Sequence, residues 1–350
     1  MNMILKLPTP SNINYYWNFG SLLGLCLMLQ ILTGFFLTMF YKADSSLSFT
    51  MVVHIMNNTN SGWMIRYLHS TGASFFFIFC FSHIGKAFFY SSFYFWKVWF
   101  SGILILLFLM MEAFLGYVLP WGQMSLWGDT VINNLISVIP YLGTMMVEWL
   151  WGGFNVADPT LIRFFSFHFI IPFIMIFVIF MHLFFLHENG SSNPLGNTLD
   201  IDKIEFKKYF IIKDMITIFI FLLFLIMMSM KFPFFFMDPE NFLLSNPMVT
   251  PIHIQPEWYF LFAYSILRSI PNKLGGVIML GMSIIILFFL SFFNFNKLKT
   301  LKFSMKKFLI NFHIGTFLIL TWLGTKPVEY PFTLVGKFYS IFYFLFYFIL

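Results

Sequence analysis

The chain has 350 residues, of which 59% are hydrophobic and only 10% are charged, and its mean hydropathy is +0.83. A soluble domain carries about 25% charged residues, so this composition excludes a soluble globular protein and indicates a polytopic membrane protein. The net charge of +6 comes mostly from lysines expected in loops, and it bears on membrane topology rather than on nucleic acid. Cys26 and Cys80 both lie in apolar runs and provide no disulfide, zinc or iron–sulfur motif.

Eight apolar runs are long enough to cross a bilayer, which takes about 20 residues. The expected fold class is therefore an all-α membrane protein with eight transmembrane helices. The polar stretches 120–156 and 233–273 are not expected to cross, and the first should form short amphipathic helices on the membrane surface. The expected spans are residues 17–40, 63–90, 98–118, 160–187, 213–232, 274–294, 305–324 and 333–350.

Eight spans place both chain ends on one side of the membrane, here named the inner side. More than half of the lysines and arginines then fall in inner loops, with a cluster at 297–307, as the positive-inside rule favours. The second and fourth spans run parallel, so positions at matching depths in them face the same membrane surface.

Histidines in these two spans are the strongest functional signal, since each span contains two of them 14 residues apart. Fourteen residues turn a helix through about 1400°, so both share one face, about 21 Å apart. His69 is then level with His168, near the outer surface, and His83 with His182, near the inner one. A lone membrane histidine more often makes a helix–helix hydrogen bond. Four at matching depths predict two stacked bis-histidine haems in a four-helix bundle formed by the first four spans.

Glycines in the first and third spans repeat the same spacing. Gly20 and Gly34 are 14 residues apart, as are Gly102 and Gly116. Gly34 and Gly116 are expected beside the outer histidines, and Gly20 and Gly102 beside the inner ones. Close helix packing through small residues favours a spacing of four, whereas glycines 14 apart leave room for two haem edges.

Four long runs carry a family resemblance: Trp17–Gly24, Gly116–Ser125, Pro256–Tyr264 and Leu267–Lys273. They resemble the cytochrome b family, whose members are the haem subunits of ubiquinol–cytochrome c reductase (respiratory complex III). The resemblance covers nearly the whole chain. The equal spacings and the unbroken chain are similar to the mitochondrial and bacterial members.

The resemblance implies a domain division and a mechanism. Residues 1–210 would form the haem-binding bundle with its surface helices, and 211–350 a C-terminal domain of spans five to eight with the Pro-Glu-Trp-Tyr loop. Quinol oxidised at the outer side would pass electrons through a low-potential outer and a high-potential inner haem b. Those electrons would reduce ubiquinone at the inner side, with proton translocation (the Q cycle).

The resemblance also implies partners and a location. The chain would act as an enzyme subunit with an iron–sulfur protein, a cytochrome c-type subunit and further subunits. That complex would be dimeric, surrounded by lipid in the mitochondrial inner membrane.

By the same resemblance, Arg66 and Lys86 are expected at propionates of the outer and inner haems. Glu257 is either a solvated loop carboxylate or a partly buried proton acceptor for quinol, and the resemblance favours the second. The residues expected to line this outer pocket with it are Pro256, Phe260, Tyr264, Tyr117, Phe114 and Gly128.

On the inner side, His187 and Asp214 are the expected proton donors to a reduced quinone. His187 follows His182 by five residues and therefore faces away from the haem ligand. By itself it would also suit an interfacial side chain. The resemblance adds Ser191 and Asn18 to this site.

Three residues depart from the family pattern. Lys86 stands where relatives commonly have Arg, and it lacks the bidentate fork of a guanidinium. Glu112 lies four residues before Gly116, where a small or hydroxyl residue is expected. We expect this carboxyl to be protonated or paired, with a role in proton exit. Asp129 stands where relatives usually carry Ala, and it is expected to alter inhibitor binding at the outer pocket.

Two other functions also suit parts of this sequence. The haem-bearing anchor of another respiratory oxidoreductase would carry similar histidines, but such proteins generally lack the motif Pro256–Tyr259. A proton or ion transporter would place membrane His and Glu at broken helices near the midplane. Here the histidines lie towards the two faces on unbroken helices.

Overall fold

The computed structural model describes residues 7–196, 200–292 and 303–350. Within these residues, eight helices are long and apolar enough to cross a membrane, which confirms the predicted fold class. The end of the sixth predicted span and the lysines between 297 and 302 lie outside the described residues. The eight helices are α2 (Phe19–Thr38), α4 (Gly62–Phe89), α5 (Trp96–Val118), α8 (Asp158–Asn189), α9 (Phe206–Lys231), α11 (Lys273–Leu290), α13 (Phe303–Gly324) and α14 (Phe332–Ile349).

The chain divides into two compact units, each assembled from separated stretches of sequence. The first unit takes residues 1–40, 55–109 and 172–235, and the second takes 41–54, 110–171 and 236–350. Both α5 and α8 therefore supply residues to both units. The predicted boundary between residues 210 and 211 differs from the boundaries of these units. It concerned the separation of the haem-binding part from the C-terminal part, and it stays a prediction.

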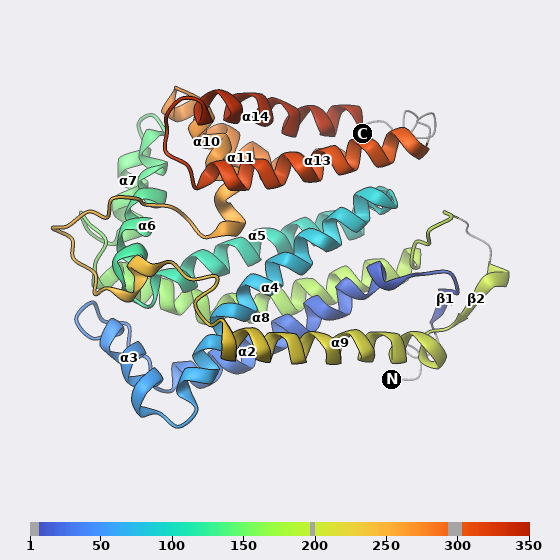
Figure 1. Ribbon diagram of the computed structural model, residues 1–350, viewed down its shortest axis with the longest axis horizontal. Coiled ribbons are helices and arrows are strands. Elements are labelled where there is room, and N and C mark those ends of the chain that lie inside the picture. Colours follow the sequence, from blue (N-terminus) through green and yellow to red (C-terminus); the bar gives the residue numbers. More distant parts are fainter. Residues whose placement is uncertain (1–6, 197–199, 293–302) are drawn as a thin grey trace. The chain divides into compact units, whose positions relative to one another are not determined.

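The first unit is a helical bundle in which α2 packs along α4 and α9 contacts both. Figure 1 shows α2 and α9 running side by side. Aromatic rings fill the contact between α4 and α9, since the ring of Phe221 lies 5.6 Å from that of Phe75 and 4.8 Å from that of Phe79. Such edge-to-face pairs add to the burial of apolar area and fix the two helices against each other.

A short ribbon at one end of this unit was not predicted. Strand β1 (Pro8–Pro10) pairs antiparallel with β2 (Lys203–Glu205). Just beyond it, the side-chain amide of Asn18 donates to the backbone oxygen of Lys213, and the ammonium of Lys213 donates to that of Ile13. The segment that precedes α2 is therefore fastened to the segment that opens α9.

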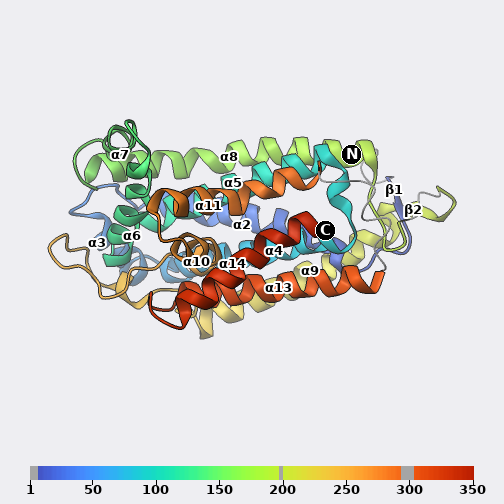
Figure 2. The ribbon, with the colours of Figure 1, turned by 90° about the horizontal axis from the view of Figure 1, so that it is seen from above.

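In the second unit, α10 (Leu261–Ser269) contacts α11, α13 and α14, and Figure 2 shows these four helices gathered together. Two short helices, α6 (Gln123–Asn134) and α7 (Gly143–Trp151), occupy the stretch predicted to be amphipathic. Asn241 holds the start of α6, because its Oδ1 accepts from the backbone N–H and the hydroxyl of Ser125. The remaining short elements are α3 (Ser48–Asn58), η1 (Tyr15–Asn18), η2 (Ser92–Tyr94), η3 (Ile136–Val138), η4 (Asp200–Asp202), η5 (Pro239–Phe242) and η6 (Trp258–Phe260).

Candidate functional site

Each histidine predicted near the outer surface lies against one of the spaced glycines. In the first unit, a Cβ added to Gly34 would stand 3.1 Å from Cε1 of His69. In the second unit, a Cβ on Gly116 would stand 2.5 Å from Cε1 of His168, which is closer than real Cβ atoms approach. The missing side chains at these two positions therefore make room for the imidazole rings themselves.

The two inner histidines lie together in the first unit, where they are close enough for an electrostatic interaction between their rings. A Cβ on Gly102 would stand 3.2 Å from Cε1 of His182, and one on Gly20 would stand 3.8 Å from Cε1 of His83. The glycine repeat thus places a histidine ring at all four positions. The contact is tightest at Gly116 and loosest at Gly20.

Two hydroxyl groups that the sequence reasoning missed set the protonation of two of these rings. Thr33 Oγ1 lies 2.8 Å from Nδ1 of His69, and Ser101 Oγ lies 2.9 Å from Nδ1 of His182. Each hydroxyl donates its own proton to a backbone oxygen, that of Leu29 at 2.6 Å or of Lys97 at 2.9 Å. With that proton engaged, the hydroxyl oxygen can accept from Nδ1–H, and this tautomer leaves Nε2 with a free lone pair.

The other two histidines have different surroundings. Nδ1 of His168 lies 2.7 Å from Oε1 of Glu112 and 3.1 Å from its backbone oxygen, so Glu112 is paired, as expected. The backbone oxygen has no proton to give, so Nδ1–H of His168 is again the donor. Nδ1 of His83 is buried and makes no hydrogen bond among the described residues.

These observations fit a haem with two imidazole ligands. Three of the four rings have an acceptor for Nδ1–H, the tautomer that leaves the Nε2 lone pair available to iron, and each ring is backed by a glycine. Among the described residues, no three His, Cys, Asp or Glu side chains gather into a metal-ion site. A haem iron takes four ligands from its porphyrin and needs only two from the protein.

The two cations predicted near the haem carboxylates both lie on α4. Nη1 of Arg66 is 3.3 Å from Oγ of Ser70, one turn further along the helix. Nζ of Lys86 lies 4.3 Å from the centre of the Trp17 ring, a cation–π contact within the first unit. Trp17 therefore supports the charge of Lys86 from one side.

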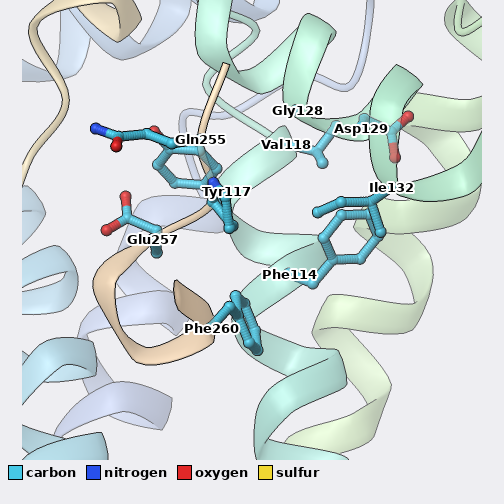
Figure 3. Close-up of a pocket in the computed structure, with 10 residues that line it drawn as sticks. Phe114, Tyr117, Val118, Gly128, Asp129, Ile132, Gln255, Glu257 and Phe260 are labelled. Atoms are coloured by element: carbon cyan, nitrogen blue, oxygen red, sulfur yellow. The ribbon is translucent and has the colours of Figure 1, made fainter. Parts of the chain in front are cut away.

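The second unit contains a pocket that gathers most of the residues predicted for the outer quinone site (Figure 3). About 310 Å³ of space outside the protein atoms lies among these residues, open solvent included. Tyr117 hydrogen-bonds the Glu257 side chain. Tyr264 is outside the lining, and its hydroxyl lies 3.5 Å from the backbone oxygen of Ile254. The lining residues are Phe114, Tyr117, Val118, Gly128, Asp129, Ile132, Gln255, Pro256, Glu257 and Phe260.

Asp129 adds a second carboxyl to this pocket. Its side chain is only 1% exposed, its Oδ1 accepts from Nδ2 of Asn133 at 2.7 Å, and its Oδ2 is buried with no partner among the described residues. Burial raises the pKa of Asp129 to about 8, against the small opposing effect of Asn133. Burial, and then the nearby Glu257 carboxylate, also raise the pKa of Tyr259 well above its ordinary range.

The residues predicted for the inner quinone site all belong to the first unit. His187 is exposed in the last turn of α8, and Ser191 is half-buried in the segment that follows. Asp214 is half-buried near the start of α9 and receives a hydrogen bond from Ser21. Asn18 is buried, and its amide donates to the backbone oxygen of Lys213 on the same helix. The structure thus gives Asn18 a structural contact that the sequence did not predict.

In a comparison with known proteins, family models of related description match the N-terminal and the C-terminal parts of the chain. A family model described as Cytochrome b/b6/petB matches residues 4–190, and one described as Cytochrome b(C-terminal)/b6/petD matches residues 244–344. Among solved structures, a chain of a "Hyperthermophilic respiratory Complex III" is similar with a TM-score of 0.90 and 30% sequence identity. That similarity covers 99% of this chain and 93% of the other.

Proposed function

Because this chain belongs to the cytochrome b family, we propose that it is the quinol-oxidising, haem-bearing subunit of a ubiquinol–cytochrome c reductase. Family membership implies haem b, and we propose two haems in each chain. His69 and His168 would ligate the outer one, and His83 and His182 the inner one.

The observation that carries this proposal is the repeated environment of the four histidines. Each ring lies against a glycine of the 14-residue repeat, and three hold Nδ1–H in a hydrogen bond that points Nε2 away from the partner. A structural histidine would use its nitrogens for helix–helix contacts and would not need a glycine at a fixed distance along the neighbouring helix. When bound, the two haems would supply one-electron carriers between the two membrane surfaces.

At the outer pocket, Glu257 would accept a proton from quinol. Tyr117 orients this carboxyl by a hydrogen bond, while Phe114 and Phe260 provide apolar walls for a quinone ring. Pro256 and Gly128 also line the pocket, and we place Tyr264 next to it as a polar contact.

At the inner side, His187 and Asp214 would return protons to the reduced quinone, with Ser191 and Asn18 as polar neighbours. Moving one electron against 100 mV of membrane potential costs about 2.3 kcal/mol. The inner haem must therefore have the higher midpoint potential for the transfer to run inward, with proton release outside.

The similarity to a chain of a respiratory complex supports a multi-subunit assembly. We propose an iron–sulfur protein and a cytochrome c-type subunit as its redox partners, in a dimeric complex with further subunits. The chain is a multi-pass membrane protein, and we propose the mitochondrial inner membrane as its location.

The decisive test is a haem assay of the purified complex with a visible redox titration. We expect two b-type haems per copy of this chain, with separate midpoints, and quinol oxidation that is lost in Glu257→Gln. A single haem would reject the stacked pair, and two haems without quinol oxidation would favour the membrane anchor of another oxidoreductase. Absence of haem would favour the transporter.

A further inference from the structure

Glu112 gives His168 a hydrogen-bonding partner of a different chemical kind from those of the other three histidines. His69 lies against a hydroxyl, His182 lies against a hydroxyl and hydrogen-bonds the backbone of Val98, and His83 has no partner at Nδ1 among the described residues. His168 instead faces a carboxyl oxygen at 2.7 Å, the shortest of the three contacts.

The sequence explains why a different group serves here. The hydroxyl residues Thr33 and Ser101 each directly precede the glycine that backs their histidine. Leu115 precedes Gly116, so no hydroxyl is available in the same place. The side chain one turn earlier on α5 fills the position, and in this chain it is an acid.

Orientation of the ring does not require that acid. The backbone oxygen of Glu112 also lies 3.1 Å from Nδ1 of His168, and this contact alone fixes the tautomer with Nδ1–H as donor. What the side chain adds is a carboxyl oxygen 2.7 Å from Nδ1, a group that can carry a negative charge where a hydroxyl cannot. The two side chains are 14% and 21% exposed, and Oε2 of Glu112 is buried without a partner among the described residues. In such low-dielectric surroundings a hydrogen bond to a charged acceptor is strengthened.

We propose that Glu112 is a positioning residue that acts through His168: its carboxylate accepts Nδ1–H and makes this imidazole the most electron-donating of the four ligands. The inference rests on the proposed function, because it needs His168 as a haem ligand. A more basic ligand stabilises ferric iron more than ferrous iron, so the outer haem is held at a lower potential than hydroxyl-supported ligands alone would give. A lower outer potential widens the step towards the inner haem.

The test compares Glu112→Gln with the parent in the purified complex, by redox titration and by EPR of the ferric haems. Gln keeps the acceptor oxygen and the size but removes the charge. We expect the outer midpoint to rise by at least a tenfold change in the ferric-to-ferrous equilibrium, about 59 mV for a one-electron couple. The EPR g values of that haem should change, and the inner haem should keep its midpoint.

Ser101→Ala is the matched control, since it removes a neutral partner from His182 and should move only the inner haem, by less. If Glu112→Gln binds haem poorly, Glu112→Thr also removes the carboxyl group and should show the same upward shift. Two haems with an unchanged outer midpoint in the charge-removing variant would overturn the inference and leave the proposed function intact. A parent complex without two haems would instead reject the proposed function.

Discussion

Lys86 rests on Trp17, with its Nζ 4.3 Å from the centre of the indole ring. The tryptophan holds the ammonium by a cation–π contact and limits where it reaches. A guanidinium at this position would stack on the same ring and still offer a planar fork to a carboxylate. We therefore expect Lys86→Arg to contact an inner-haem propionate more strongly and to raise the midpoint of that haem modestly.

Lys97→Arg is the control for this prediction. Lys97 is another lysine of the first unit, and its Nζ is paired with Oε1 of Glu188 at 2.7 Å. The same change there should leave both midpoints in place. An unchanged inner midpoint in Lys86→Arg would contradict the prediction.

The four glycines differ in how much space they have, and this predicts unequal effects of alanine. A Cβ at Gly116 would meet the His168 ring at 2.5 Å, whereas at Gly20 it would meet His83 at an ordinary 3.8 Å. Overpacking of this kind costs about 1–3 kcal/mol, here directed at a ligand ring. Gly116→Ala should lose the outer haem, and Gly20→Ala should keep both haems, as measured from the absorbance of the reduced complex. Equal losses in both variants would show that the ring is not the obstacle.

Thr33→Val removes the hydroxyl that accepts from His69 while keeping the shape of the side chain. Partners of this type contribute about 10-fold to 100-fold to metal affinity. We expect the outer haem to dissociate more readily in detergent and its midpoint to change, with the inner haem unaffected. Thr33→Ser restores the hydroxyl and should restore both properties, whereas a variant that behaves like the parent would mean that the hydroxyl is not needed.

The buried carboxyl of Asp129 predicts a pH dependence of stability. Its pKa of about 8 lies above the ordinary 3.8, so the folded protein binds this proton more tightly than the unfolded chain does. That contribution to stability is complete below about pH 4 and is lost as the pH rises through about 8. Asp129→Asn should therefore unfold at a higher temperature than the parent at pH 9, with a smaller difference at pH 5.

Asp44→Asn is the comparison variant, because the contribution of this carboxyl to stability changes with pH in the opposite direction. Hydrogen bonds from Ser46 lower the pKa of this partly exposed carboxyl, so its contribution to stability is present at high pH and is lost on acidification. Removing it should not stabilise the protein at pH 9. Thermal unfolding of the purified complex from pH 5 to 9 tests the predictions for both variants. Identical profiles for Asp129→Asn and the parent would contradict the prediction for Asp129.

Patterns that repeat over many residues were predicted correctly, and contacts made by single residues were not. The eight spans and the two short helices after α5 follow from apolar runs and amphipathic stretches, and all lie where expected. Strand β1 is three residues long with two prolines, so no alternation predicts its pairing. The contacts of Thr33 and Ser101 were not predicted, because a single hydroxyl in an apolar helix gives no periodic signal. The feature that could have indicated them is their position directly before a glycine of the repeat.

Glu112 shows a further reason why the site was only partly predictable. The sequence showed that Glu112 departs from the family pattern and indicated that it is protonated or paired. The role expected for it was proton exit, and that role stays a prediction. Which partner it has depends on how α5 and α8 are turned about their axes within the second unit. A one-residue difference in rotation moves a side chain by about 100°, beyond what hydropathy determines.

The β1–β2 ribbon has a consequence for how the chain is made. The hydrogen bonds that tie the start of α2 to α9 wait for a segment translated much later, since Asn18 and its acceptor on α9 are 195 residues apart. The first four helices must therefore enter the bilayer before these bonds can form, while the segment that leads into α2 contacts α4 through pairs such as Trp17 and Lys86. A nascent chain that ends before residue 203 leaves the buried Asn18 amide without its partner. Completion of the bundle is in this way deferred until the fifth helix emerges.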